Sequence, residues 1–208
     1  MTTAARTGRR TNQERTEEST VRLLSAAIAL FAEKGYERTT AAEIGTRAGF
    51  SRNMVRDRYG SKEALLASVF DIFRQRLLPS ARTERVGTGL DHVLGQLDDL
   101  LVSVEQEPET IRAMIVLTFE TPGALSEFYS WLDDLVAGYQ RELCEHLVAG
   151  QRDGSVRTEL DVERESEMFV SYAIGLCFRS ALGRDAYDFA GEIRSWRTRL
   201  KAHYSPPA

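Results

Sequence analysis

The sequence predicts an all-α protein of about nine helices. Apolar side chains recur at spacings of three and four residues along most of the 208-residue chain, which is the period of an amphipathic helix. No segment shows the strict alternation of a half-buried strand. Capping residues, glycines and prolines separate the periodic stretches. With 42% hydrophobic residues, the chain suits one ordinary domain, or a small domain joined to a medium one.

Residues 1–14 are expected to form a flexible basic arm. They are polar, contain Arg6, Arg9 and Arg10, and show no apolar periodicity. Such an arm either enters a DNA minor groove or serves as a solubilising tail.

The first helix is expected over residues 20–35. Gly35 is a plausible end, because glycine accepts the backbone conformation that often follows a helix. The stripe that should face the core consists of Val21, Leu24, Ile28 and Phe31.

Two short helices should follow. Thr40 stands three residues before Glu43, the spacing of a capping box, and Gly49 ends the helix that begins there. Ser51 is then expected to cap a third helix that ends at Gly60. On that third helix Val55 and Tyr59 lie within about 40° of each other and should pack inward with Phe50, whereas Asn53 and Asp57 should point outward.

Ser61 can cap a fourth helix, which should run to Pro79 and bury Leu65, Val69 and Ile72. Two short helices joined through a glycine turn and braced by a longer preceding helix make a helix-turn-helix.

Five further helices are expected after a loop at residues 80–89. Pro108 suits the first turn of one of them, and the sequence TPG at 121–123 ends it. The expected helices cover residues 90–106, 108–120, 124–150, 161–182 and 186–203.

Charge is divided unevenly along the chain. Residues 1–62 carry 12 Lys and Arg against 7 Asp and Glu, whereas residues 63–208 carry 15 against 24. A basic amino-terminal part on an acidic remainder indicates that only the first part approaches a polyanion.

Several other classes of protein are excluded. No apolar run approaches the roughly 18 to 20 residues of a membrane helix, and no hydrophobic stretch follows the first charges, so we expect a cytoplasmic protein. The chain lacks a glycine-rich phosphate loop, HExxH, GxSxG and clustered histidines, so we expect no enzyme, cofactor or metal. Cys144 and Cys177 are expected to be buried small hydrophobic residues, and Cys144 and His146 point about 200° apart on a helix.

The stretch LLSAAIALFAEKGYERTTAAEIGTRAGFSRNMVRDRYGSKEALL, residues 23–66, resembles the DNA-binding domain of the TetR (tetracycline-repressor) family of bacterial transcription regulators. The residues that carry the resemblance are Ala27, Leu30, Phe31, Gly35, Tyr36, Thr40, Ile44, Ala48, Gly49, Ser51, Tyr59, Ser61, Lys62, Glu63, Leu65 and Leu66. The chain departs from the family pattern at Arg56 and Arg58, where an aromatic residue and a histidine are frequent.

The resemblance implies a helix-turn-helix domain over residues 15–62 and a helical ligand-binding and dimerisation domain over residues 63–208. It implies a homodimer that binds a palindromic DNA operator, represses transcription and is released by a small, largely apolar molecule. The alternative is a DNA-binding protein of the same fold without an inducer, either a constitutive regulator or a chromosome organiser.

Residue chemistry suggests how the third helix would contact DNA. Arg56, Arg58 and Lys62 can bind phosphates, and Arg52 and Asn53 can form two-pronged contacts with guanine and adenine. The complete set of predicted contacts is Thr40, Ser51, Arg52, Asn53, Met54, Arg56, Arg58 and Lys62.

The roles of three polar residues differ from these. Thr40 and Ser51 can each offer a hydroxyl or a helix-start amide to a phosphate. Asp57 either accepts a hydrogen bond from a cytosine amino group or orients a neighbouring arginine through a salt bridge, and the sequence leaves both roles open.

Two sets of candidates lie in the second domain. The ligand-pocket candidates are Met114, Leu117, Phe128, Trp131, Leu135, Tyr139, Met168 and Tyr172, with Arg112, Glu120 or Arg179 as possible polar anchors. The dimer-interface candidates are Ala173, Gly175, Phe189, Ile193, Trp196 and Leu200. Packing within one subunit would use the same apolar residues.

Overall fold

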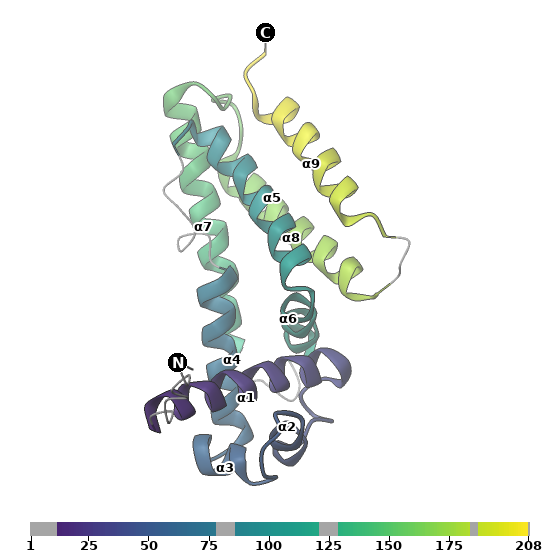
Figure 1. Ribbon diagram of the computed structural model, residues 1–208. Coiled ribbons are helices and arrows are strands. Elements are labelled where there is room, and N and C mark those ends of the chain that lie inside the picture. Colours follow the sequence, from purple (N-terminus) through teal and green to yellow (C-terminus); the bar gives the residue numbers. More distant parts are fainter. Residues whose placement is uncertain (1–11, 78–85, 121–128, 184–186, 208) are drawn as a thin grey trace, which may run out of the picture. The chain divides into compact units, whose positions relative to one another are not determined.

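The computed structural model describes residues 12–77, 86–120, 129–183 and 187–207, and within these ranges the chain is helical without strands. The all-α fold class is confirmed. Figure 1 shows the helices α1 (Asn12–Lys34), α2 (Ala41–Arg47), α3 (Met54–Tyr59), α4 (Lys62–Leu77), α5 (Gly89–Gln106), α6 (Pro108–Glu120), α7 (Tyr129–Asp153), α8 (Val162–Ala181) and α9 (Phe189–Tyr204).

The chain divides into two compact units, Met1–Phe70 and Asp71–Ala208, which we call the head and the body. The division falls inside α4, whereas the sequence placed a boundary between residues 62 and 63. The physical reason is that the first turns of α4 bury Leu65 and Val69 completely, so these turns belong to the core of the head.

Helix α1 begins earlier than expected, and the face that it buries differs from the predicted one. It starts at Asn12, so residues 12–14 are helical, and the rest of the predicted arm lies outside the described residues. Val21 is 63% exposed and does not belong to the core stripe. Leu23 and Ala27 are fully buried instead, because the centre of the apolar face lies on their side of the helix.

The capping box at the start of α2 is confirmed. The Oγ1 atom of Thr40 accepts a hydrogen bond from the Glu43 backbone N–H at 3.2 Å, and the Glu43 carboxylate accepts one from the Thr40 N–H at 2.9 Å. Gly49 follows with φ of 78°, a conformation that favours glycine.

Helix α3 begins at Met54, later than the predicted cap at Ser51. The Ser51 carbonyl accepts a hydrogen bond from the Met54 N–H at 3.0 Å, which closes a turn, and Asn53 caps the helix without a side-chain hydrogen bond. The helix ends at Gly60, as predicted, and Val55 is fully buried.

Local signals locate the other helix starts. Ser61 accepts a hydrogen bond from the Ala64 N–H at 3.1 Å, and Pro108 is the first residue of α6, as predicted for both. Thr88 and Asp91 form a second capping box at the start of α5, which was not predicted from the sequence. Helix α7 continues to Asp153, beyond the expected end at residue 150.

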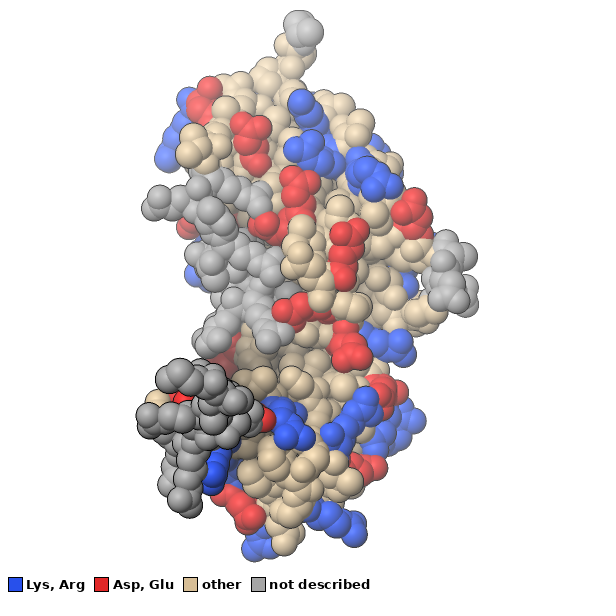
Figure 2. All heavy atoms as spheres, in the orientation of Figure 1, with Lys and Arg blue, Asp and Glu red and all other residues tan. Residues whose placement is uncertain are grey.

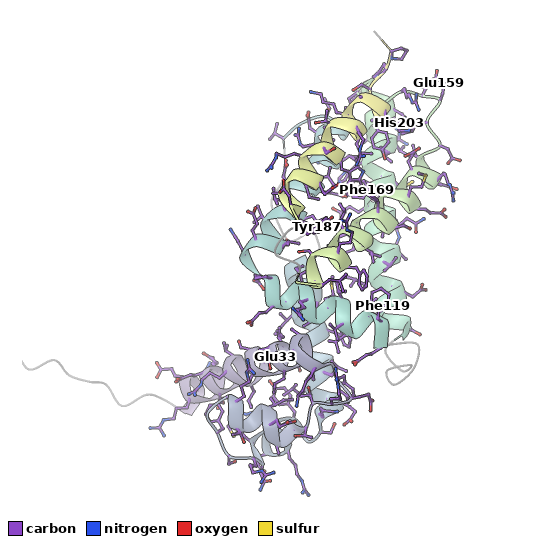
Figure 3. All side chains as sticks on the ribbon, turned by 90° about the vertical axis from the view of Figure 1, so that its right-hand side faces the viewer. Glu33, Phe119, Glu159, Phe169, Tyr187 and His203 are labelled. Carbon is purple, nitrogen blue, oxygen red and sulfur yellow. The ribbon has the colours of Figure 1, made fainter. Side chains whose placement is uncertain are left out.

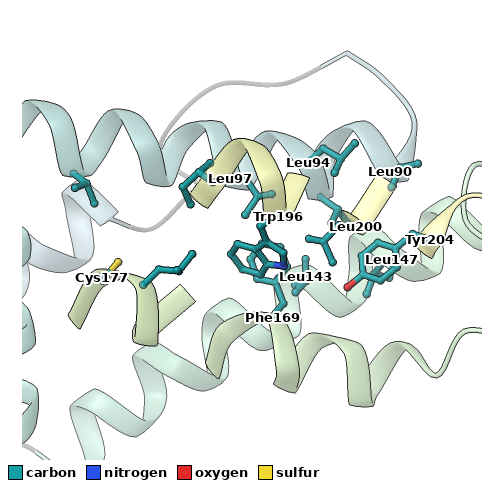
Figure 4. Close-up of a cluster of buried hydrophobic side chains, with 14 of the residues drawn as sticks. Leu90, Leu94, Leu97, Leu143, Leu147, Phe169, Cys177, Trp196, Leu200 and Tyr204 are labelled. Atoms are coloured by element: carbon teal, nitrogen blue, oxygen red, sulfur yellow. The ribbon is translucent and has the colours of Figure 1, made fainter. Parts of the chain in front are cut away.

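One apolar core holds the body together. Helix α5 packs against α7 and α9, and α8 packs against α6 and α7. Figure 4 shows the centre of this core, where the ring centroids of Phe169 and Trp196 lie 4.5 Å apart. Leu143 and Leu147 from α7 and Leu200 from α9 are buried in the same cluster.

Helices α5 and α7 approach closely through glycines. A Cβ atom at Gly89 would collide with the backbone of Gly150. The same approach brings His92 and His146 together, with ring centroids 5.0 Å apart, although they are far apart in the sequence. Cys144 and Cys177 are both free, and Cys177 is buried as expected. None of the helices in the described ranges has the length and hydropathy needed to cross a membrane.

Candidate functional site

The outer face of α3 carries polar side chains that no part of the described chain engages. Arg52, Asn53, Arg56 and Asp57 are all exposed, and none of their side chains has a hydrogen bond or ion pair with another described residue. The structure therefore does not show the salt bridge that was one of the two roles considered for Asp57. Because these side chains are not used to stabilise the fold, they are available to a partner.

A hollow of about 540 Å³ lies beside α3 on the head. Arginines from two helices line it. Figure 2 shows Lys and Arg side chains on the face of the head that the view presents, with acidic side chains between them. The lining residues are Arg15, Thr16, Glu18, Ser19, Arg22, Phe50, Met54 and Arg58. Three guanidinium groups against one carboxylate favour an anion at this surface.

Two of these arginines are held in place. The Nη2 atom of Arg58 donates a hydrogen bond to Ser19 Oγ at 2.6 Å, and the Arg22 guanidinium lies 4.7 Å from the centre of the Phe50 ring. Phe50, which lies in the turn before α3, thus also packs against the Arg22 side chain of α1. Positioned guanidinium groups bind phosphate with less loss of side-chain entropy than free ones.

Lys62 has a structural role in the head. Its Nζ atom donates to the backbone carbonyls of Tyr36 at 3.0 Å and Thr39 at 2.9 Å, and it lies 3.8 Å from the centre of the Tyr36 ring. Since these contacts use two of its three donors, the lysine mainly stabilises the turn between α1 and α2. The sequence predicted only a phosphate contact for it.

The Thr40 hydroxyl is also engaged, because it donates to the Glu43 carboxylate at 2.8 Å. Lys34 binds the same carboxylate at 2.7 Å and is the largest cause that lowers the pKa of Glu43, to about 2; the hydrogen bonds from Thr40 add to the effect. Ser51 is exposed at the surface, and Met54 is half-buried at the edge of the arginine hollow.

Sequence patterns alone did not identify the residues that position α2 and the turn before α3. A Cβ atom on Gly45 would lie 2.5 Å from the Ser51 carbonyl oxygen, so only glycine lets α2 approach the turn this closely. Arg47 of α2 binds both carboxylate oxygens of Glu33 on α1, at 2.8 and 2.6 Å. Figure 3 labels Glu33. The one available signal was a glycine inside the helical stretch AAEIGTR, which costs stability unless a close contact requires it.

The body contains a cavity of about 160 Å³ between α5, α6, α7 and α8. Most of its lining is apolar. The lining residues are Gln96, Asp99, Leu100, Ser103, Ile111, Met114, Ile115, Thr118, Leu132, Leu135, Val136, Tyr139, Phe169, Val170, Ala173, Ile174 and Cys177.

Three of the predicted pocket residues, Met114, Leu135 and Tyr139, line this cavity. Leu117 is fully buried but is not part of the lining, and Met168 and Tyr172 are exposed. Phe128 lies outside the described residues, as does the side chain of Trp131. None of the proposed anchors, Arg112, Glu120 and Arg179, lines the cavity; Arg179 lies over the Tyr187 ring instead.

The polar part of the lining is concentrated on α5, where Gln96, Asp99 and Ser103 lie on one face. The Nε2 atom of Gln96 is buried and has no hydrogen-bond partner among the described residues. The sequence contained a signal for this polar face. Gln96, Asp99 and Ser103 are spaced three and four residues apart, which places them on one side of a mostly apolar helix.

The α9 candidates for a dimer interface belong to the core of the subunit. Phe189, Ile193, Trp196 and Leu200 are buried against α5 and α8, so the apolar face of α9 is used within the subunit, which was the alternative explanation for it. Of the two α8 candidates, Ala173 lines the cavity and Gly175 is exposed.

A different apolar surface is exposed on α8. Its members lie at spacings of three and four residues, and Phe119 of α6 adds to it, with its ring centroid 5.1 Å from that of Phe178. We call this surface the α8 stripe; it consists of Met168, Tyr172, Gly175, Phe178 and Leu182. Figure 3 marks Phe119 at the end of α6.

Comparison with known proteins relates the head to a family of regulators. Residues 23–69 match the sequence profile described as "Bacterial regulatory proteins, tetR family". The chain is 27% identical over 194 residues to a probable HTH-type transcriptional regulator, ArpR, of Pseudomonas putida, and the match covers 90% of this chain and 91% of that protein.

Two further matches extend over most of the chain. The HTH-type transcriptional repressor KstR2 of Rhodococcus jostii is 28% identical over 163 residues, covering 77% of this chain and 74% of that protein. The crystal structure of NalD, the secondary repressor of the MexAB-OprM multidrug efflux pump in Pseudomonas aeruginosa, superimposes with a TM-score of 0.74 at 18% identity, covering 92% of this chain and all of that chain. These relatives are transcriptional regulators and not enzymes.

Proposed function

Because the chain belongs to the tetR family of bacterial regulatory proteins, we propose that it is a repressor that binds a palindromic DNA operator as a homodimer and is released by a small molecule. The observation that carries this proposal is the outer face of α3, whose exposed polar side chains have no partner in the described part of the chain. Two of the similar proteins, KstR2 and NalD, are repressors, which supports repression rather than activation.

The residues of the head divide into two groups by chemistry. Arg58, Arg22 and Arg15 lie around the hollow beside α3 and suit phosphates, which set the position of the head on the duplex. Arg52 and Asn53 lie at the start of α3, where side chains reach base edges in the major groove, and they suit guanine and adenine. Arg56 adds a further phosphate contact.

The α8 stripe is the surface that we assign to the homodimer. Tyr172 and Phe178 are each 39% exposed, and Met168 and Leu182 are 52% and 55% exposed, which is an unusual concentration of apolar side chains on one helix surface. Gly175 in the middle has open space around it and permits close approach of a second helix. A dimer supplies two heads for the two half-sites of a palindrome.

The cavity of the body is the site that we assign to the effector. It lies between four helices of the body, so a bound molecule would contact all four. A ligand that binds one arrangement of these helices more tightly than another shifts the population towards that arrangement. The effector would favour the state in which the two heads do not fit consecutive major grooves. This mechanism would operate in the cytoplasm.

The alternative function is a DNA-binding protein of the same fold without an inducer. It shares the head and the dimer but leaves the cavity without a ligand. A screen of small molecules for release of the protein from DNA separates the two functions, since the alternative expects no compound to weaken binding.

Footprinting of the purified protein on the DNA upstream of its own gene tests the proposal. We expect a protected palindrome whose affinity falls steeply with salt concentration. Absence of any protected site across salt concentrations would contradict both functions, because both depend on the head.

A further inference from the structure

We propose that α8 pairs in antiparallel direction with α8 of a second copy of this chain, across a two-fold axis that passes beside Gly175. In this arrangement Met168 lies next to the partner's Leu182, and Tyr172 lies next to the partner's Phe178. The arrangement rests on the homodimer of the proposed function. It adds the direction of the two helices and the residues that meet, which follow from the order of side chains along the α8 stripe.

The α8 stripe has the same chemistry on both sides of Gly175. Met168 and Leu182 are each seven residues from this glycine, and Tyr172 and Phe178 are each three residues from it. Leu182 extends the face beyond the last turn, because as the C-cap residue it keeps helical dihedral angles. A two-fold axis perpendicular to α8 reverses the helix, so each apolar side chain meets the one at the same distance beyond Gly175. The stripe is therefore complementary to itself.

The polar residues of this face are symmetric as well. Ser171 and Arg179 are each four residues from Gly175, and both are exposed. Antiparallel pairing places Arg179 next to the partner's Ser171, whose hydroxyl oxygen can accept a hydrogen bond. Parallel pairing would instead place Arg179 next to the partner's Arg179, where two like charges repel each other. The polar positions therefore favour the antiparallel direction.

The charges along the whole of α8 favour the same direction. The part before Gly175 carries three glutamates and one arginine, whereas the part after it carries one charged residue, Arg179. An antiparallel partner places its basic part along the acidic part of the first helix. A parallel partner would align the two acidic parts, which costs affinity.

Gly175 permits the two helices to approach each other closely at the axis. Glycine inside a helix is less stable than alanine, and a Cβ atom at this position would meet nothing within 4 Å in the subunit. Packing within the subunit therefore does not require glycine here. The distance between two packed helices depends on the side chains at their contact, so a glycine at the axis gives a short one.

The two aromatic rings of the α8 stripe are held in position before a partner arrives. The Tyr172 hydroxyl accepts a hydrogen bond from Arg199 Nη2 at 3.3 Å, and its ring centroid lies 4.7 Å from that of Trp196. The Phe178 ring packs on Phe119 of α6, with centroids 5.1 Å apart. Side chains that are already ordered lose less conformational entropy on association, and aromatic residues are enriched in interfaces.

Disulfide cross-linking of cysteine variants tests which residues meet. Cys144→Ala is introduced first, because Cys144 is partly exposed, whereas burial raises the pKa of Cys177 to about 12 and keeps its thiol unreactive at neutral pH. In this background, Met168→Cys combined with Leu182→Cys should give a covalent dimer on mild oxidation, since the two positions meet across the interface. Non-reducing electrophoresis should show the dimer, and reduction should return it to a monomer.

Met168→Cys alone is the matched control for the direction. In antiparallel pairing it lies about 21 Å along the helix from the same position of the partner and should not cross-link, whereas parallel pairing would cross-link it. Gly175→Cys should cross-link to its own copy at the axis, and it retains all four apolar side chains of the stripe. Val102→Cys, at an exposed position outside the stripe, should give no covalent dimer.

Sedimentation velocity and thermal unfolding of the reduced variants verify that they dimerise and fold. Cross-linking of Met168→Cys alone would overturn the antiparallel direction. A dimer in which neither Gly175→Cys nor the double variant cross-links would overturn the axis at Gly175. An unsubstituted protein that stays monomeric would contradict the pairing altogether, because a second copy then does not cover the stripe.

Footprinting of the same variants distinguishes this arrangement from the proposed function. If the unsubstituted protein is a dimer that protects a palindrome, but the expected positions do not cross-link, the proposed function stands and the arrangement of α8 is wrong. If the positions cross-link as expected and the dimer protects no DNA, the arrangement stands and the proposed function fails.

Discussion

Arg58 and Asn53 of the head are proposed to contribute to DNA binding in different ways. Arg58→Ala should weaken binding to every DNA sequence and reduce the slope of log affinity against log salt by about 0.9, because one phosphate contact is lost. Asn53→Ala should change the preferred base at one position by about 1–3 kcal/mol and leave the salt slope nearly unchanged. Fluorescence anisotropy at several salt concentrations, with the operator and with scrambled DNA, measures both quantities.

Ser19→Ala is the control for Arg58, since it removes the hydrogen bond that holds the guanidinium and retains its charge. It should lower affinity less than Arg58→Ala and keep the salt slope. If Asn53→Ala instead lowered affinity for all sequences equally, the division between phosphate contacts and base contacts would be incorrect.

Glu43 makes the stability of the head sensitive to acid. Its hydrogen bonds from Lys34 and Thr40 lower its pKa from an ordinary value of 4.5 to about 2. A lowered pKa in the folded state means that the stabilisation is complete above pH 4.5 and is lost as the pH falls from 4.5 to about 2. Glu43→Gln should therefore lower Tm at pH 7, and the difference from the unsubstituted protein should shrink towards pH 2.

Exposed Glu37 provides the comparison, because it has no hydrogen bond with a described residue. Thermal unfolding of Glu37→Gln across the same pH range should parallel that of the unsubstituted protein. A constant difference in Tm between Glu43→Gln and the unsubstituted protein from pH 7 to pH 2 would refute the assigned role of Glu43.

At the scale of the element, Gly45 determines how closely α2 approaches the turn before α3. Gly45→Ala should lower the free energy of unfolding by about 1–3 kcal/mol, because the new methyl group meets a backbone carbonyl that cannot rotate away. It should also weaken operator binding, since the turn before α3 must shift. Chemical denaturation and anisotropy measure the two effects.

Gly138→Ala in α7 is the matched control, because a Cβ atom there meets nothing within 4 Å. It should raise the free energy of unfolding by about 0.5–1 kcal/mol, the usual gain when alanine replaces glycine inside a helix. Equal effects of the two substitutions would show that helix propensity, rather than the contact with Ser51, determines the result at Gly45.

Helix ends that are determined by residues close in the sequence could be predicted. The capping box of Thr40 and Glu43, the cap at Ser61 and the start of α6 at Pro108 all follow from interactions within a few residues. The fold class and the outward face of α3 followed from such patterns, because periodicity identifies which side of a helix is polar.

Features that depend on distant contacts could not be predicted. The start of α3 depends on the turn that Ser51 forms beside Gly45, and Lys62 binds carbonyls more than twenty residues before it. The apolar face of α9 suited an interface and a core equally well, and only the positions of α5 and α8 decide between them. The burial of Gln96 Nε2 without a hydrogen-bond partner among the described residues likewise depends on side chains from other helices.

At the scale of the whole molecule, the α8 stripe predicts the oligomeric state. Phe178→Glu should convert a dimer into a monomer, because a charge at the centre of an apolar contact remains desolvated. Sedimentation velocity should show the change in mass, and operator affinity should fall at least tenfold, since one head alone contacts only one half-site.

Val102→Glu on α5 is the control. Val102 is 41% exposed, which is close to the 39% of Phe178, and it lies outside the α8 stripe. It should leave the mass and the operator affinity unchanged. A monomeric unsubstituted protein, or a dimer that persists with Phe178→Glu, would place the interface elsewhere.

The distribution of the cavity lining over four helices affects how related regulators can diverge. The polar side chains Gln96, Asp99 and Ser103 occupy one face of α5 within eight residues, whereas α6 and α8 contribute mainly hydrocarbon. Gene duplication followed by a few substitutions in this short segment would create a sensor for a different compound. The head and most of the core would be inherited without change. With the function proposed above, the operator and the effector would then evolve separately.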